Sequence, residues 1–66
     1  MLNGPLIKKL RAAKDFTQEE LAAEAKVSRP TVIKAEQGAN IDFTSLGKLA
    51  HVLGVSPGDL LVDVAP

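Results

Sequence analysis

The stretch TQEELAAEAKVSRPTVIKAEQG, residues Thr17 to Gly38, contains two helix-start signals only eleven residues apart. The first is a capping box, because Thr17 and Glu20 have the T-x-x-E spacing in which each side chain pairs with a backbone N–H of the other residue. The second is Ser28, a favoured N-cap, with Pro30 in the following turn, where a missing N–H does no harm. The sequence therefore predicts two short helices joined by a tight turn.

The second of these helices is predicted to present most of its side chains outward. At about 100° per residue, one face of roughly 140° holds five residues, namely Arg29, Pro30, Ile33, Lys34 and Gln37. The opposite face offers only Val32 and Ala35. Small residues, Ala22, Ala25 and Ala35, allow the two helices to cross closely, with Val27 turned inward.

Three further helices are expected around this pair. The first runs from Pro5 or Leu6 to about Lys14, the next from after Asp42 to a stop at Gly54, and the last opens with SPGD at residues 56–59. The first is expected to bury Leu6, Ile7, Leu10 and Ala13, and the next Phe43, Leu46, Leu49, Ala50 and Leu53. Because no alternating apolar run suggests a strand, the predicted fold class is all-α, with five short helices.

Composition sets further bounds. A chain of 66 residues is long enough for one core, so residues 1–66 are expected to form one domain. The chain has no cysteine and one histidine, His51, expected on the surface, so neither a metal nor another cofactor is predicted. No apolar run approaches the ~20 residues of a membrane span, and no signal peptide is apparent, which favours a cytoplasmic protein. No acid–base pair, nucleophile set or phosphate loop indicates an enzyme.

The charges are unevenly distributed along the chain. Residues 1–34 hold seven basic and four acidic side chains, whereas residues 35–66 hold one basic and four acidic. The first part is therefore +3 and the second −3. Two interpretations stay open. The asymmetry arises by chance on a mixed solvated surface, or it belongs to a dipolar protein whose positive end faces a polyanion.

The quoted stretch closely resembles the helix-turn-helix of the Cro/cI-type, or XRE, family of DNA-binding regulators. The later stretch LGKLAHVLGVSPGDLL, residues 46–61, resembles the fourth and fifth helices of that family. The likeness covers about residues 6–61, with the helix-turn-helix at about 17–37. It implies a five-helix lambda-repressor-like domain and a small homodimeric transcriptional repressor, bacterial or phage-encoded. Such a protein binds double-stranded DNA at a roughly palindromic operator and is nucleoid-associated when bound.

The resemblance also implies roles for individual residues. Base contacts are expected from the outward positions of the second short helix, Arg29, Pro30, Ile33 and Lys34. Phosphate contacts are expected from Thr17, Gln18, Thr31, Asn40 and Thr44. Two alternatives stay open: Lys34 would reach a base or a phosphate, and Ile33 would touch a thymine methyl or another protein. The segment 38–42 lacks the cations that relatives with strong operators carry, so modest affinity is expected.

Other positions of the family pattern concern structure and assembly. Arg11 and Glu36 match a partly buried ion pair between the first and third helices. Lys26 stands where the family usually has glycine, in a left-handed turn position. Leu61, Val62 and Val64 are expected to form a dimer contact, and the alternative is that Leu60 and Leu61 simply close the core.

A rival function uses the same fold. Related domains serve as antitoxins or adaptors, which would make this chain a protein-interaction module with a partner such as a toxin. An outward Ile33 and the acidic row Glu19, Glu20 and Glu24 favour that alternative.

Overall fold

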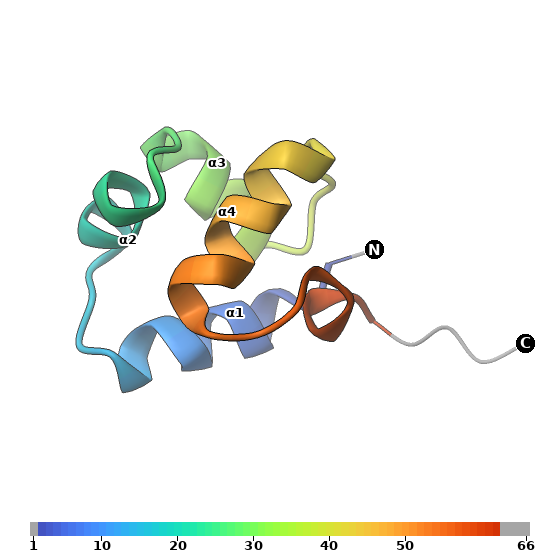
Figure 1. Ribbon diagram of the computed structural model, residues 1–66, viewed down its shortest axis with the longest axis horizontal. Coiled ribbons are helices and arrows are strands. Elements are labelled where there is room, and N and C mark those ends of the chain that lie inside the picture. Colours follow the sequence, from blue (N-terminus) through green and yellow to red (C-terminus); the bar gives the residue numbers. More distant parts are fainter. Residues whose placement is uncertain (1, 63–66) are drawn as a thin grey trace, which may run out of the picture.

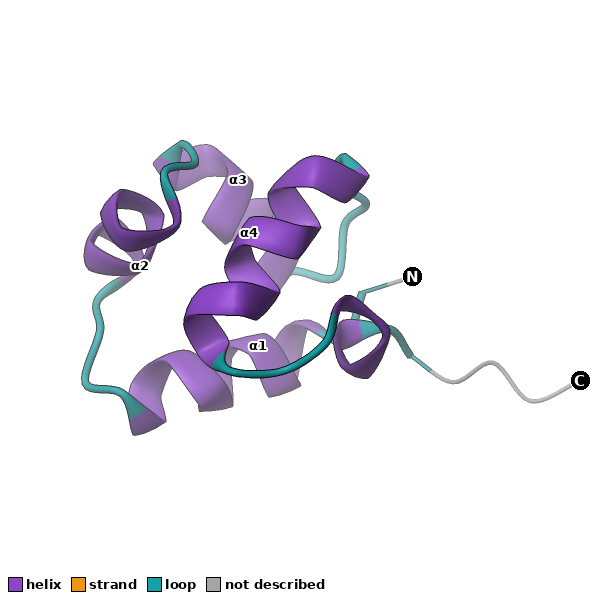
Figure 2. Ribbon diagram, in the orientation of Figure 1, coloured by secondary structure: helices purple, strands orange, loops and turns teal. Residues whose placement is uncertain are grey.

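Four α-helices and one 3-10 turn make up the computed structural model, which describes residues 2–62 (Figures 1 and 2). The helices are α1 (Gly4–Ala13), α2 (Gln18–Ala25), α3 (Arg29–Glu36) and α4 (Phe43–Leu53), followed by η1 (Pro57–Leu60). The predicted all-α fold is confirmed. The expected fifth helix is a 3-10 turn of four residues, after which the chain becomes extended at Leu61 and forms an isolated antiparallel bridge with Leu2. No helix within residues 2–62 is long and apolar enough to cross a membrane.

Side-chain caps determine where the helices begin. The capping box of Thr17 and Glu20 is present, Ser28 accepts from the N–H of Thr31, and Asp42 accepts from the N–H of Ser45. These starts agree with the sequence. The start of α1 lies slightly earlier than predicted, at Gly4, because the side chain of Asn3 caps the helix by accepting from the N–H of Leu6 at 3.2 Å.

Each of the four α-helices is followed within two residues by a residue at positive φ. These residues are Asp15, Lys26, Gly38 and Gly54, with φ of 59°, 58°, 80° and 77°. After each of these residues, the N–H of the next residue donates to the carbonyl five residues earlier. This hydrogen bond pairs a backbone carbonyl that the end of the helix would otherwise leave without a partner. The left-handed conformation predicted at Lys26 is confirmed, whereas that of Asp15 was not anticipated.

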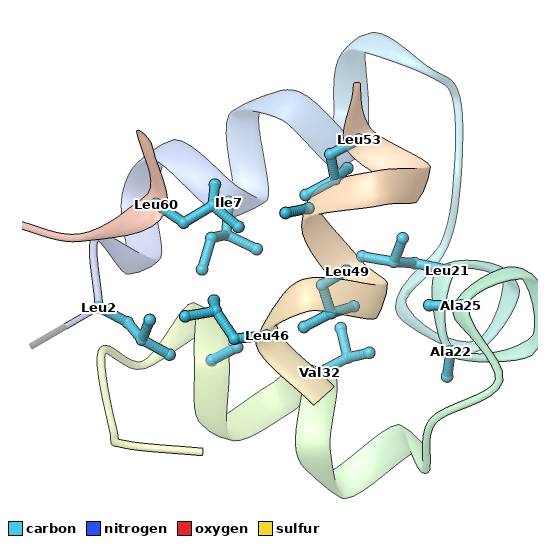
Figure 3. Close-up of a cluster of buried hydrophobic side chains, with 12 residues drawn as sticks. Leu2, Ile7, Leu21, Ala22, Ala25, Val32, Leu46, Leu49, Leu53 and Leu60 are labelled. Atoms are coloured by element: carbon cyan, nitrogen blue, oxygen red, sulfur yellow. The ribbon is translucent and has the colours of Figure 1, made fainter. Parts of the chain in front are cut away.

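The core forms around α4, which runs through the middle of the molecule (Figures 1 and 3). The same core cluster contains buried side chains from α1, α2, α3 and η1. The largest fully buried side chains are Ile7, Leu21, Val32, Leu49 and Leu60. Leu2, which the sequence analysis left outside the domain core, is also buried and lies beside Leu46 in Figure 3.

Phe43 was predicted to be buried, and this was wrong: it is 76% exposed. The stripe of α4 that faces the core consists of Leu46, Leu49, Ala50 and Leu53, all buried. Phe43 is the first residue of the helix, one turn before Leu46, and the described residues leave its side chain largely uncovered. The stripe predicted for α1 was also too wide, because Ile7 is buried while Leu6 and Leu10 are half-buried and Ala13 is exposed.

Candidate nucleic-acid interface

The segment between α2 and α3 is a three-residue turn, Lys26–Ser28. Lys26 takes the left-handed conformation with φ 58° and ψ 43°, and the N–H of Val27 then donates to the carbonyl of Ala22 at 3.0 Å. Val27 is half-buried against the core, as expected. Because the turn is only three residues long, α3 begins directly beside the end of α2.

Small side chains fill the contact between the helices. Leu21, Ala22 and Ala25 of α2 and Val32 and Ala35 of α3 are buried. Alanine at three of these positions lets the backbones approach closely. The two helices are therefore held together by a compact apolar contact, and Arg29, Pro30 and Lys34 of α3 stay exposed to solvent.

The outward face of α3 is exposed as predicted, except at Ile33. Arg29, Pro30 and Lys34 are exposed, and Ile33 is half-buried. Arg29 and Lys34 thus place two cations on the exposed side of the helix, five residues apart. The inner face of the helix is fully covered, since Val32 and Ala35 are 0% exposed. A helix with this arrangement can enter a groove without losing its contacts with the core.

The residues expected to touch phosphates lie at helix starts. The hydroxyl of Thr17 accepts from the N–H of Glu20 at 3.0 Å, and it keeps its own proton for an external acceptor. Thr31 is half-buried and shares a hydrogen bond of 2.7 Å with the hydroxyl of Ser28. Asn40 and Thr44 are exposed on either side of the cap of α4.

That cap carries a negative charge. The carboxylate of Asp42 accepts from the hydroxyl of Ser45 at 2.7 Å and from its N–H at 3.0 Å. These hydrogen bonds, the side-chain one first, hold the pKa of Asp42 below its ordinary value. Asp42 therefore stays ionised at the start of α4.

Arg11 and Glu36 meet between α1 and the end of α3. The Nε of Arg11 lies 2.5 Å from Oε2 of Glu36, and Nη2 lies 3.3 Å from Oε1. A third donor of the guanidinium, Nη1, reaches the carbonyl of Phe16 at 2.6 Å. The two side chains are 14% and 5% exposed, so the pair is largely removed from water.

Gln18 also contacts this pair, and the sequence did not predict that contact. Its Nε2 donates to Oε1 of Glu36 at 3.1 Å. The carboxylate thereby ties together α1, the start of α2 and the end of α3. The positions of Gln18 and Glu36 are 18 residues apart, and no spacing rule within a helix relates them.

Gly4 packs against the end of α3. A Cβ at this position would overlap the carbonyl oxygen of Glu36 and lie 2.9 Å from the nitrogen of Gly38. Only glycine permits this approach of α1 to the same end of α3 that carries the ion pair.

Two of the three residues expected at a dimer contact can be placed. Leu61 is 48% exposed and Val62 is 39% exposed, while Val64 lies outside the described residues. Leu60, by contrast, is fully buried, so the core is closed by Leu60 and not by Leu61.

A three-residue turn joins two short helices that pack against each other, and the second helix has an exposed polar face. This arrangement is a helix-turn-helix. A family model described as helix-turn-helix matches residues 7–60. The chain belongs to the XRE family of helix-turn-helix DNA-binding transcription regulators.

Several known proteins are similar. Control protein C.BamHI of Bacillus amyloliquefaciens is 33% identical over 63 residues, covering 92% of this chain and 78% of its own length. The restriction-modification controller protein C.AhdI of Aeromonas hydrophila superposes with a TM-score of 0.77 at 34% identity, covering 88% of this chain and 89% of its own.

SinR of Bacillus subtilis, a master regulator for biofilm formation, is also similar. The structure of a SinR/SinI complex contains a chain with a TM-score of 0.82 at 33% identity, over 92% of this chain. This chain spans 60% of that one. SinR in complex with DNA matches with a TM-score of 0.75 at 32% identity, over 83% of this chain and 90% of that one. The matched family and these three relatives are regulators.

Proposed function

We propose that this protein binds a specific, roughly palindromic DNA sequence as a homodimer and represses transcription there, with α3 in the major groove. The observation that carries the proposal is the division of α3 into a covered face, Val32 and Ala35, and a polar face with Arg29 and Lys34 exposed. The similarity to two controller proteins and to a regulator solved with DNA supports it.

Arg29 is the main candidate for reading a base. It is exposed at the first position of α3, where the helix would meet base edges. A guanidinium can donate two parallel hydrogen bonds to O6 and N7 of guanine, which is worth about 1–3 kcal/mol of discrimination. Lys34 would reach a second base or a phosphate. The half-buried Ile33 suits a thymine methyl, with Pro30 fitting the groove beside it.

Phosphate contacts would fix the register of α3 on the duplex. Thr17 and Gln18 lie at the start of α2, Thr31 lies beside the start of α3, and Asn40 and Thr44 flank the start of α4. All five are uncharged, and Asp42 adds a negative charge near the last two. Since the logarithm of the binding constant falls with the logarithm of salt by about 0.9 per phosphate neutralised by a cation, a shallow salt dependence is expected.

Dimerisation would supply the remaining affinity. Leu61 and Val62 are exposed apolar residues just beyond the core and, with Val64, are the candidates for the contact. A dimer would place two copies of α3 about 34 Å apart, one turn of DNA. Truncation after Leu61 should lower the dimer fraction in sedimentation equilibrium, and an unchanged fraction would exclude Val62 and Val64 from the contact.

The first experiment is selection of bound duplexes from a random library at moderate salt. An inverted repeat with half-sites about ten base pairs apart should be enriched. Arg29→Ala should then lose preference at one base pair of each half-site. Lys9→Ala removes the same charge from an exposed position on α1 and is the matched control. If no sequence is enriched while circular dichroism shows a folded protein, the proposal is wrong.

A second candidate function is a protein-interaction module. Glu19, Glu20 and Glu24 are all exposed on α2, and SinR has been solved in a complex with the protein SinI. Such a module, an antitoxin or an adaptor, would retain its partner after Arg29→Ala. A pure protein-interaction module would select no duplex sequence, whereas a DNA-binding protein would select one and lose preference at one base pair of each half-site with Arg29→Ala.

A further inference from the structure

The amide of Gln18 is held by a carboxylate at the edge of the proposed DNA interface. Gln18 is the first residue of α2, and Glu36 is the last residue of α3. Oε2 of Glu36 accepts from Nε of Arg11, and Oε1 accepts both from Nη2 of Arg11 and from Nε2 of Gln18. The half-buried side chain of Gln18 is thus attached to a nearly buried ion pair.

This contact determines which way the amide points. An ionised carboxylate only accepts hydrogen bonds, so the nitrogen of Gln18, and not its oxygen, must face Glu36. The primary amide has two N–H groups, of which Glu36 uses one. The second N–H remains for another acceptor near the start of α2. The N–H groups of Gln18 and Glu19 precede the first intrahelical bond, from the N–H of Leu21 to the carbonyl of Thr17, and belong to the donors that a helix leaves unpaired.

Arg11 makes this arrangement compatible with an anion. A lone carboxylate beside Gln18 would repel a phosphate, but the guanidinium of Arg11 neutralises it at 2.5 Å. Arg11 also donates to the carbonyl of Phe16, just before α2 begins, so the same side chain fixes the backbone that leads into Gln18.

We propose that Glu36, held by Arg11, is a positioning residue for DNA binding. Its carboxylate orients the amide of Gln18 so that the second N–H donates to a backbone phosphate. The inference rests on the proposed function, since it presupposes that the start of α2 lies against DNA. It gives the ion pair a role in the interface besides its role in the fold.

The test is a double-mutant cycle measured on DNA affinity. Four proteins are compared: the unchanged chain, Gln18→Ala, the pair-deleted variant Arg11→Met with Glu36→Leu, and the triple variant. Replacing both partners of a buried pair by apolar residues of similar volume usually preserves folding. Each protein is titrated with a duplex recovered by selection and with a random-sequence duplex of equal length, at a temperature where urea melts show every variant folded.

In the unchanged background, Gln18→Ala should weaken binding about tenfold, as expected for a hydrogen bond to a charged group. The loss should be equal on both duplexes, because a phosphate contact carries no sequence information. In the pair-deleted background, the same substitution should weaken binding less than about twofold. If the pair-deleted variant is unfolded, Glu36→Gln replaces it, since a glutamine no longer dictates which end of the Gln18 amide faces it.

Two results would overturn the inference. One is an equal loss from Gln18→Ala in both backgrounds, which would mean that the ion pair does not orient the amide. The other is no loss in the unchanged background, which would leave Gln18 as a purely structural link between α2 and α3. Both require that the unchanged chain binds DNA. If it binds neither duplex, the proposed function itself has failed.

Discussion

Replacement of Glu36 by alanine should destabilise the fold severely. The carboxylate is 5% exposed and accepts three hydrogen bonds, two from Arg11 and one from Gln18. Its removal leaves the guanidinium of Arg11, 14% exposed, with the carbonyl of Phe16 as its remaining partner. Breaking one side of a buried pair costs about 3–5 kcal/mol. Because Arg11 keeps one partner and some contact with water, we expect the lower end, about 3 kcal/mol.

This loss is large for so small a domain. At about 0.05–0.15 kcal/mol per residue, a chain of this length has a free energy of unfolding of roughly 3–10 kcal/mol. Thermal unfolding followed by circular dichroism should show the midpoint reduced by about 12–24 °C, since 1 kcal/mol corresponds to about 4–8 °C. Gln18→Ala, which removes only a neutral donor, should cost about 1 kcal/mol. A midpoint for Glu36→Ala within about 4 °C of the unchanged chain would refute the reasoning.

Three further changes test other features, each by urea denaturation. Lys26→Gly should raise the free energy of unfolding by up to about 1 kcal/mol, because it relieves a non-glycine residue at φ 58°, and a decrease would contradict this. Gly4→Ala should lower it by about 1–3 kcal/mol, since the new Cβ overlaps the backbone at Glu36; an unaltered midpoint would show that α1 can shift freely. Because the pKa of Asp42 is lower in the folded state, the ionised side chain stabilises the fold above the unfolded-state pKa. This stabilisation is lost as the pH falls through the folded-state pKa. Asparagine is also a good cap, so the free energy of unfolding of Asp42→Asn should rise relative to that of the unchanged chain as the pH falls. Parallel pH profiles of the two proteins would contradict this.

Sequence patterns predicted the helices well because the signals involved are local. Thr17 with Glu20, Ser28, Asp42 and Ser56 with Asp59 each act over three residues, and each begins a helix where expected. The exposed polar face of α3 followed from the helical period alone. The end of α1 was harder, because Asp15 adopts a conformation for which glycine is the usual signal, and the same conformation at Lys26 was expected only from the family resemblance.

What could not be predicted depends on contacts between distant segments. Phe43 fits the apolar period of α4, but whether its side chain is covered depends on where the neighbouring elements end. Leu2 is buried because the chain returns to it at Leu61, which no pattern near residue 2 announces. The bond from Gln18 to Glu36 likewise depends on how two helices cross. The family resemblance suggested the partner of Arg11 but not this third member.

The pairing of Leu2 with Leu61 has a consequence for the order in which the chain folds. The N–H of Asn3 donates to the carbonyl of Leu60 at 2.7 Å, so the two ends close a loop of nearly the whole described chain. Closing so long a loop is entropically the most costly step, whereas α2 and α3 meet through a turn of three residues. The two helices proposed to bind DNA would therefore associate early, and the contact between Leu2 and Leu61 would form last and open first.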